Sequence, residues 1–570
     1  MRKILLTLSI LTLLTTQACK EPQTTESVDT IIFNGAFYTA DSIQKNVTAV
    51  AIKDGKIVAL GSTEDIQKMA TEKTEKIDAK GNFVMPGIIE GHGHIHGLGS
   101  SLVSLNLMEA KSWDEIVAMV AEAAKKAKPG DWIIGRGWHQ EKWNTAPQPN
   151  HMGYPYHESL DAVSPNNPVF LSHASGHSCY VNAKALELSG ITDATANPSG
   201  GDIVKDGKKK IVGVLEETAQ RLIYQAYETW ENQRSEAERN ASWAKMFDLA
   251  EGECLKNGIT SFHDAGSNFQ QVAWMKALAD SGKLKVRHWV MVREGYTNLK
   301  TNKEAFKIKD AGNGKLTVQA VKVSLDGALG SYGAWLLEPY SDRKGWVGLN
   351  TFNIDSLKAI AAFCWENKLQ LCVHAIGDKA NRETINIFAE QIQKQPSSDH
   401  RWRVEHAQHV NPSEIPRFKQ WNVIASMQSI HCTSDAPFVE KRLGKERAAN
   451  GAYMWKAFLN AGVVVTNGTD VPVEKIDPFA CIYAAVTRKQ KNGEAFYPEQ
   501  KMTREEALYS YTMANAYSSF QDKEKGSLSV GKYADIVILD KNLLTCDEEA
   551  IKSTKVIKTI VGGKTLYSNQ

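Results

Sequence analysis

The chain has 570 residues, of which 42% are hydrophobic and 23% charged, so it can bury a large core without disulfides or a structural metal. Its formal net charge is +2, and loss of the two basic residues at its N-terminus would leave 65 basic residues beside 65 acidic ones, with no basic stripe of the kind that binds nucleic acid. The eight cysteines are scattered and form no Cys-x-x-Cys pair, which argues against a disulfide framework.

Residues 1–18 are typical of an export signal. Two basic residues precede an apolar run at 4–14, which is too short to span a membrane as a mature helix. Cys19 follows the small residue Ala18, and this resembles the lipid-attachment site of bacterial lipoproteins, with 19–27 as a polar tether. We therefore predict an exported protein of the bacterial cell envelope that touches a membrane only through its lipid anchor. Ordinary cleavage after Ala18, which would release a soluble periplasmic protein, is the alternative.

Short β-strands with tight turns are predicted at both ends of the chain. Asn-Gly and Asp-Gly dipeptides separate apolar runs within 28–82, which is typical of hairpins. A similar pattern returns within 519–570, in the runs 533–539 and 556–564. Neither piece is large enough to close a core alone. We therefore predict that the two pieces form one small composite β-sandwich domain, with a larger domain between them.

The larger domain, 83–518, alternates helical stretches with apolar runs that end in polar residues. Eight such runs favour an α/β fold, the (β/α)8 or TIM-type barrel, whose catalytic groups lie at the carboxyl ends of the strands. The stretch from about 98 to 258 is too long for one helical connection, so we predict that it is an insertion over the barrel mouth. The eight runs are 83–94, 259–264, 286–292, 318–325, 369–374, 402–406, 423–428 and 463–470.

Ionisable side chains gather at the ends of these predicted strands. His92 and His94, two residues apart on a strand, point the same way and can bind one metal ion. By itself the pair is weak evidence, because a chain with 15 histidines contains His-x-His by chance fairly often. Several ionisable groups buried together in one barrel mouth would be costly without a metal or strong pairing, so convergence favours a metal site. The other strand-end groups are Lys322, His374, His406 and Asp470.

Several motifs resemble those of the amidohydrolase superfamily. Residues 84–94, Val-Met-Pro-Gly-Ile-Ile-Glu-Gly-His-Gly-His, resemble its opening motif, and the terminal β pieces resemble its composite sandwich domain. Other stretches resemble the branch called amidohydrolase family 3, or YtcJ-like, and they occur in order along the chain. These stretches are 135–138, 175–182, 213–217, 322–331, 373–378 and 468–470.

The resemblance implies a site for one or two divalent metal ions, with zinc expected. It assigns His92 and His94 to one ion, and it assigns His374 and His406 to a second. Asp470 would bind the first ion or its hydroxide, and it would act as the catalytic residue that accepts and returns the proton.

Three residues bear on how this assignment applies. Lys322 would bridge the two ions only after carboxylation by carbon dioxide, because a lysine ammonium has no free lone pair. If Lys322 is ion-paired with Asp326 instead, the site would hold one ion. Glu90 stands where the superfamily usually has aspartate, so we expect it to support the site without being a ligand. His96 has no ligand role in the family, and we expect it to line the barrel mouth.

The chemistry implied is hydrolysis of a non-peptide carbon–nitrogen bond, of amide type, in a small molecule by metal-bound hydroxide. Hydrolysis of an ester, lactone or phosphoester at the same site is one alternative, and a non-catalytic solute-binding lipoprotein of the envelope is another. We predict substrate contacts by His177, Trp138, Asn182 and Tyr332, although Trp138 and Tyr332 could instead pack the insertion on the barrel. His431, after the seventh strand, could contact substrate or lie in a solvated loop. The sequence leaves open whether copies of the chain form a homo-oligomer.

Overall fold

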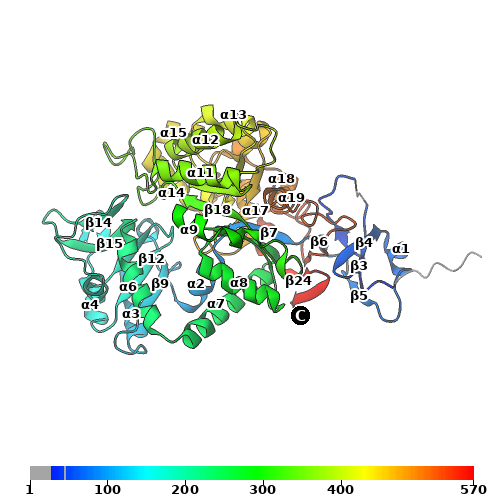
Figure 1. Ribbon diagram of the computed structural model, residues 1–570, viewed down its shortest axis with the longest axis horizontal. Coiled ribbons are helices and arrows are strands. Elements are labelled where there is room, and N and C mark those ends of the chain that lie inside the picture. Colours follow the sequence, from blue (N-terminus) through cyan, green and yellow to red (C-terminus); the bar gives the residue numbers. More distant parts are fainter. Residues whose placement is uncertain (1–26, 44–45, 570) are drawn as a thin grey trace, which may run out of the picture.

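The computed structural model describes residues 27–43 and 46–569, so the predicted signal peptide and Cys19 lie outside the described residues. A barrel occupies the middle of the molecule, with an inserted sheet on one side and the blue N-terminal strands on the other (Figure 1). Within the described ranges, no helix is long and apolar enough to cross a membrane.

Eight parallel strands form the barrel, in the order of the chain from β7 to β22. Asn515 closes the remaining seam, because its Nδ2 donates to the carbonyl of Ile89 at 2.7 Å and to that of Asn467 at 2.8 Å. The predicted TIM-type barrel is therefore confirmed. Its strands are β7 (Ile88–Gly93), β16 (Ile259–Ser267), β17 (Arg287–Val292), β18 (Leu316–Ser324), β19 (Gln370–Ala375), β20 (Arg403–His406), β21 (Ile424–Met427) and β22 (Val465–Asn467).

Helices surround the barrel, and several begin at capping residues visible in the sequence. Ser235 and Glu238 form a reciprocal capping box at the start of α7, and Asn268 and Gln271 form another at the start of α8. The helices associated with the barrel are α2 (Ile95–Val103), α7 (Glu236–Lys256), α8 (Phe269–Asp280), α9 (Tyr296–Thr301), α10 (Ala311–Gly314), α11 (Ile354–Glu366), α12 (Asp378–Ile392), α13 (Ile415–Gln420), α14 (Ser429–Leu443), α15 (Lys445–Gly451), α16 (Trp455–Asn460), α17 (Pro478–Thr487), α18 (Arg504–Ser510) and α19 (Met513–Ser518).

Strands from both ends of the chain share a sheet in a small β domain. β6 (Phe83–Pro86) pairs antiparallel with β23 (Ile536–Leu539), so the run predicted as one barrel strand at 83–94 is divided between this sheet and β7. Gly87 connects β6 to β7, and no side chain fits at this position because a Cβ there would lie 2.1 Å from Thr260 Oγ1. One sheet has the order β4-β3-β1-β5 and the other β2-β6-β23-β24-β25. The other elements are β1 (Thr30–Phe33), β2 (Ala36–Phe37), β3 (Ala49–Lys53), β4 (Lys56–Gly61), α1 (Thr63–Gln67), β5 (Glu75–Asp78), β24 (Val556–Val561) and β25 (Lys564–Ser568).

A buried ion pair joins this β domain to the barrel. Arg287 on β17 has its Nε 2.7 Å from Asp535 Oδ2, and its Nη2 donates to Oδ1 at 3.0 Å. The backbone N–H of Gly562 donates to the same carboxylate at 2.8 Å. Burial alone would raise the pKa of Asp535, but Arg287 keeps it below its usual value. The C-terminal strands are thereby held against the barrel wall.

The segment between β7 and β16 forms a separate six-stranded sheet in the order β14-β15-β13-β12-β9-β8. Parallel pairs join β12 to β9 and β9 to β8, and antiparallel pairs join the rest. The helices of this insertion are α3 (Trp113–Ala124), α4 (Glu158–Val163), α5 (Ala183–Leu188) and α6 (Gln220–Gln233). Its strands are β8 (Leu105–Asn106), β9 (Ile133–Trp138), β10 (Asn150–His151), β11 (Tyr154–Pro155), β12 (Val169–His173), β13 (Ser178–Val181), β14 (Gly201–Lys205) and β15 (Ile211–Glu217).

Candidate metal centre

Potential metal-binding atoms converge at the carboxyl end of the barrel. In the described part of the chain, one atom each from His92, His406 and Asp470 lie within 4.8 Å of one another, and all three side chains are buried. His94 Nε2 lies 3.3 Å from Asp470 Oδ1. The ring centroid of His374 is 4.4 Å from that of His406. The histidines and the aspartate predicted at the strand ends therefore lie together, with His406 adjoining both His92 and His374.

His92 is oriented by a buried carboxylate. Glu405 Oε2 accepts a short hydrogen bond from His92 Nδ1. Because a carboxylate only accepts, the imidazole proton is on Nδ1 and Nε2 carries a lone pair. Arg403 in turn holds Glu405, with Nε 2.6 Å from Oε1 and Nη2 donating to Oε2 at 2.9 Å. Burial would raise the pKa of Glu405, but Arg403 and His92 keep it well below its usual value. Arg403 and Glu405 therefore hold His92 ready to bind a metal through Nε2.

His406 is oriented in the same way by an amide. Gln428 Oε1 lies 2.8 Å from His406 Nδ1, and since this oxygen only accepts, Nδ1 donates and Nε2 keeps its lone pair. Burial lowers the pKa of His92 to about 4, and burial also lowers those of His374 and His406 well below the usual value. These three imidazoles are therefore neutral near pH 7, which is the form that binds metal.

Asp470 lies in a turn just after β22. Its φ is 56°, a conformation that aspartate adopts more readily than most residues, and its N–H donates to His92 O at 2.8 Å. Glu90 supports this turn, because Oε1 accepts from Thr469 N at 2.6 Å and Oε2 accepts from Thr469 Oγ1 at 3.1 Å. Glu90 thus positions the backbone that carries Asp470.

The chemistry of the cluster fits a divalent metal ion. Buried polar atoms left unpaired cost about 1–3 kcal/mol each, so a group of them in one place needs an explanation. Neutral imidazole nitrogens and carboxylate oxygens are ligands that zinc favours. Among the described residues, the buried atoms here without a hydrogen-bond partner are Nε2 of His92, His374 and His431, and Oδ1 of Asp470.

Lys322 on β18 lies close to these histidines and is only 2% exposed. Asp326, its partner in the alternative interpretation, accepts instead from the backbone N–H groups of Trp335, Ile376 and Gly377 at 2.9, 2.9 and 2.8 Å. Burial lowers the pKa of Lys322 to about 8. Within the described chain the Lys322–Asp326 ion pair does not form, which leaves the lysine amine available for carboxylation.

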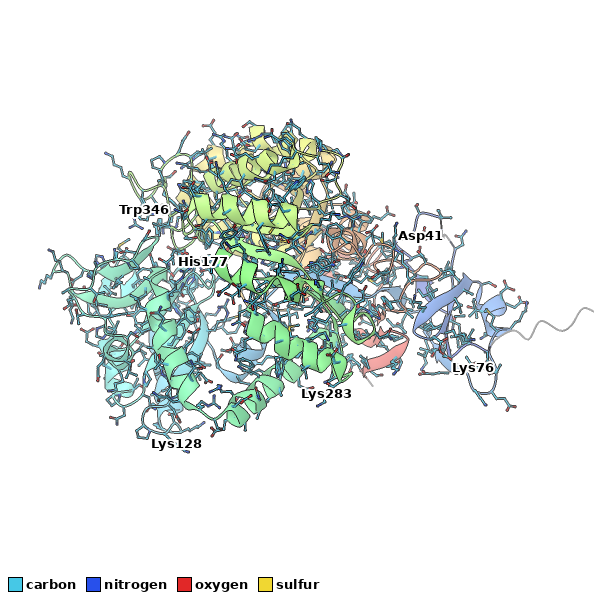
Figure 2. All side chains as sticks on the ribbon, viewed as in Figure 1. Asp41, Lys76, Lys128, His177, Lys283 and Trp346 are labelled. Carbon is cyan, nitrogen blue, oxygen red and sulfur yellow. The ribbon has the colours of Figure 1, made fainter. Side chains whose placement is uncertain are left out.

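The cluster opens into a cavity of about 750 Å³ between the barrel mouth and the insertion. His177 lines this cavity and lies where the insertion meets the barrel (Figure 2). Its Nδ1 is 2.8 Å from Glu217 Oε2, and its ring centroid is 5.1 Å from that of His374. His177 is therefore placed to contact a bound substrate.

The other three predicted substrate residues do not line the cavity. Trp138 is fully buried in the core of the insertion and donates its Nε1–H to Leu171 O at 2.8 Å. Asn182 is the cap of α5, where its Oδ1 accepts from Ala185 N. Tyr332 donates to Asp342 at 3.1 Å outside the cavity wall. Packing and capping account for these side chains, and of the four predicted substrate residues only His177 lines the cavity.

Of His431 and His96, only His431 lines the cavity. Its Nδ1 accepts from Gln408 Nε2 at 2.8 Å, because an amide nitrogen only donates. Neutral His431 therefore carries its proton on Nε2, 3.9 Å from Asp470 Oδ2. His96 lies on α2 and packs against Phe247 and Trp274, not in the cavity wall as expected.

A model of the amidohydrolase family matches residues 75–567. The chain belongs to the amidohydrolase family. It is 31% identical over 555 residues to the protein LONG AFTER FAR-RED 3 of Arabidopsis thaliana, covering 95% of this chain and 91% of that protein. It is 25% identical over 557 residues to the N-substituted formamide deformylase of Arthrobacter pascens, covering 95% and 99%. The crystal structure of an uncharacterized metal-dependent hydrolase from Pyrococcus horikoshii superposes with a TM-score of 0.73 at 27% identity, covering 91% and 99%.

These matches confirm the predicted resemblance to amidohydrolase family 3. The amidohydrolase is an enzyme, a metal-dependent hydrolase that acts on carbon–nitrogen bonds other than peptide bonds.

Sequence reasoning missed the groups that hold the amidohydrolase's ligands. Arg403 and Glu405 are two apart on β20, so they share a face of the strand, and this alternation beside His406 was a usable signal. Glu217 lies in a stretch that carries the family resemblance, but its contact with His177 depends on how the insertion folds over the barrel.

Proposed function

We propose that this amidohydrolase hydrolyses an amide-type carbon–nitrogen bond of a small molecule, with zinc as its metal and Asp470 as the group that moves the proton. The observation that carries the proposal is the buried, unpartnered Oδ1 of Asp470 beside imidazole nitrogens at the cavity. A relative that aligns with 95% of this chain is named as an N-substituted formamide deformylase, which supports amide-type chemistry.

Asp470 is suited to both proton transfers of such a reaction. His92, His94 and Asp470 would hold a divalent ion, whose Lewis acidity would lower the pKa of water toward neutrality and polarise a substrate carbonyl. The Asp470 carboxylate accepts the proton of the attacking water. It then returns this proton to the departing nitrogen, because a neutral amine is a much better leaving group than a nitrogen anion.

His431 provides a donor for the carbonyl oxygen. Its Nε2–H is buried, has no partner among the described residues, and lies 3.9 Å from Asp470 Oδ2. A substrate carbonyl beside Asp470 would accept this hydrogen bond as negative charge develops on its oxygen. We therefore assign His431 the role of stabilising that charge.

We propose that His374 and His406 hold a second metal ion and that carboxylated Lys322 bridges the two ions. Carboxylation requires an uncharged amine, and burial, which lowers the pKa of Lys322 to about 8, increases the share of that form. The backbone amides that hydrogen-bond Asp326 keep that carboxylate from pairing with the lysine. Elemental analysis distinguishes the two arrangements, since two ions per chain indicate a bridging Lys322 and one ion indicates an unmodified lysine.

We expect the zinc-loaded protein to hydrolyse members of a panel of N-substituted formamides, N-acyl amines and ureas, as followed by release of the amine. Best turnover on esters, lactones or phosphoesters, with none on amides, would move the function to that alternative. A purified protein that retains less than roughly a tenth of an equivalent of any metal, and shows no turnover, would favour the solute-binding alternative.

We also propose that the enzyme is exported and anchored through a lipid on Cys19, a residue outside the described range. The support is the run of basic, apolar and small residues at 1–19. In a bacterial host, Cys19→Ser is expected to abolish incorporation of labelled fatty acid and to move the protein from the membrane fraction to the soluble envelope fraction. A wild-type protein without label would indicate ordinary cleavage after Ala18.

A further inference from the structure

Three arginines face the cavity from two different parts of the fold. Arg136 comes from β9 and Arg221 from α6, both in the insertion, whereas Arg293 directly follows the barrel strand β17. Tyr224 on α6 lines the same cavity. Within the described chain, none of the three arginines forms an ion pair with a carboxylate, so this wall carries positive charge without a counterion.

Hydrogen bonds hold two of these guanidinium groups without neutralising them. Arg136 Nε donates to Pro472 O at 3.0 Å and its Nη2 donates to Ala174 O at 2.9 Å. Arg293 Nη2 donates to Ser324 Oγ at 2.9 Å. In both arginines, N–H groups remain to bind a ligand, because a guanidinium has five. Two hydrogen bonds hold the partly buried Arg136, so it loses little conformational entropy when a ligand binds, whereas Arg293 is exposed and held by one.

A glycine makes room for Arg293. Gly266, on β16, has a φ of 147°, and a Cβ there would lie 3.0 Å from Arg293 Cδ and 3.2 Å from its Cβ. Any side chain at this position would displace the arginine stem. The backbone is thus compatible with this placement of Arg293 only because position 266 is glycine.

Six acidic side chains line the cavity, and within the described chain all but Glu474 contact groups other than the three arginines. Glu217 pairs with His177 at 2.8 Å. Glu294, next to Arg293 in the chain, accepts from Asn298 Nδ2 at 3.0 Å. Asp470 faces the histidines of the metal centre. In the described part of the chain, none of these three carboxylates forms an ion pair with an arginine of the cavity, although Asp470 acts on Arg136 from a distance.

The three arginines line one cavity, and Arg221 and Arg293 repel each other there. Although Arg293 is exposed, loss of part of its hydration lowers its pKa, and Arg221 lowers it further by repulsion. Tyr224 is 42% exposed, and the protein around its hydroxyl raises its pKa, whereas Arg136 and Arg293 both act in the opposite direction. Arg136 donates to the carbonyl of Pro472, two residues after Asp470, so this cationic wall adjoins the metal centre. An anion bound here would relieve the mutual repulsion of the cations.

We propose that Arg136, Arg221 and Arg293 form an oxyanion-binding subsite, and that the substrate is an amide whose amine portion bears a carboxylate or phosphate group. Guanidinium groups bind both oxyanions through charge-assisted hydrogen bonds, often two at a time. This inference rests on the proposed function for the identity of the cleaved bond, but the anion subsite itself can be measured without turnover.

Three formamides of matched length test the substrate class: N-formyl-4-aminobutyrate, N-formyl-3-aminopropyl phosphate and neutral N-formylbutylamine. We expect kcat/KM for at least one anionic member to exceed that for the neutral member by about tenfold or more, a size typical of one charge-assisted hydrogen bond. The preferred anion identifies the source as carboxylate or phosphate. Equal kcat/KM for charged and neutral members would overturn the proposal.

Variants connect that preference to the arginines. Arg136→Gln/Arg293→Gln is expected to reduce the anionic-to-neutral ratio about tenfold, chiefly through KM, and Arg293→Lys should retain part of it. The control Arg382→Gln alters an arginine on α12 that pairs with Glu414 at 2.8 Å outside this cavity, and it should keep the wild-type ratio. A wild-type ratio in the double variant would overturn the subsite.

A binding measurement separates this inference from the proposed function. Calorimetry of the zinc-loaded protein with glutarate, with uncharged glutaramide as the control ligand, reports anion binding even if no formamide is cleaved. Weaker glutarate binding in the double variant, at unchanged zinc content and circular dichroism, would support the subsite although the proposed reaction had failed. Equal glutarate binding in both proteins would overturn the subsite although formamides were hydrolysed.

Discussion

Asp470→Asn is expected to lower kcat by about 10²- to 10⁴-fold, the range of rate that a positioned proton-transfer group contributes. Asparagine has the same shape and keeps an oxygen that can face a metal, but its amide cannot accept the proton of the attacking water. Most of the bound metal should therefore remain. Steady-state kinetics with the best substrate of the panel, together with elemental analysis of the same preparation, measure the two effects.

Asp399→Asn is a suitable control, because it makes the same chemical change at an exposed carboxylate that pairs with Arg401. It should match the wild type in kcat and metal content. Full activity in Asp470→Asn would assign the proton transfer to another group. Loss of metal in parallel with activity would show that Asp470 acts mainly as a metal ligand.

Glu405→Ala is expected to affect both stability and metal binding. Arg403 is fully buried, and without Glu405 its charge is left uncompensated, a change that typically costs about 3–5 kcal/mol. His92 also loses the acceptor for its Nδ1–H, and loss of such a partner typically lowers metal affinity about 10- to 100-fold. Denaturation with urea and competition against a metal chelator measure the two effects separately.

Two further variants separate the contributions of Glu405. Glu405→Gln keeps an oxygen that can accept from His92 but removes the charge, so its metal affinity should exceed that of Glu405→Ala. Arg403→Met/Glu405→Gln removes the buried charge altogether, so it should be more stable than Glu405→Ala. Wild-type stability in Glu405→Ala would show that Arg403 has another counterion.

The barrel could be predicted from the sequence because its strands are buried on both faces. Such strands appear as nearly continuous apolar runs, and the polar residue that ends each run marks the edge facing the cavity. This regularity also predicted which side chains would meet. His92 and His406 are more than 300 positions apart, yet their rings lie 4.6 Å apart, because the carboxyl ends of all eight strands face the same side.

The substrate contacts could not be predicted in the same way. Trp138 and Asn182 lie in the insertion, whose sheet has its own core, and there an aromatic or amide side chain packs or caps as readily as it contacts a ligand. Arg136 and Arg293 are far apart in the chain and have no motif in common. Their role as one cationic wall depends on how the insertion docks on the barrel.

By itself, the sequence determined the family, the barrel and the side chains that converge at its mouth, since local apolar runs and one repeated geometry are sufficient for these. The tertiary structure alone decided which atoms face the centre. The lone pair on Nε2 of His92 depends on the Glu405 hydrogen bond, and the absence of a Lys322–Asp326 ion pair among the described residues depends on backbone amides that hydrogen-bond Asp326. Both are contacts between distant segments, and no local pattern in the chain records them.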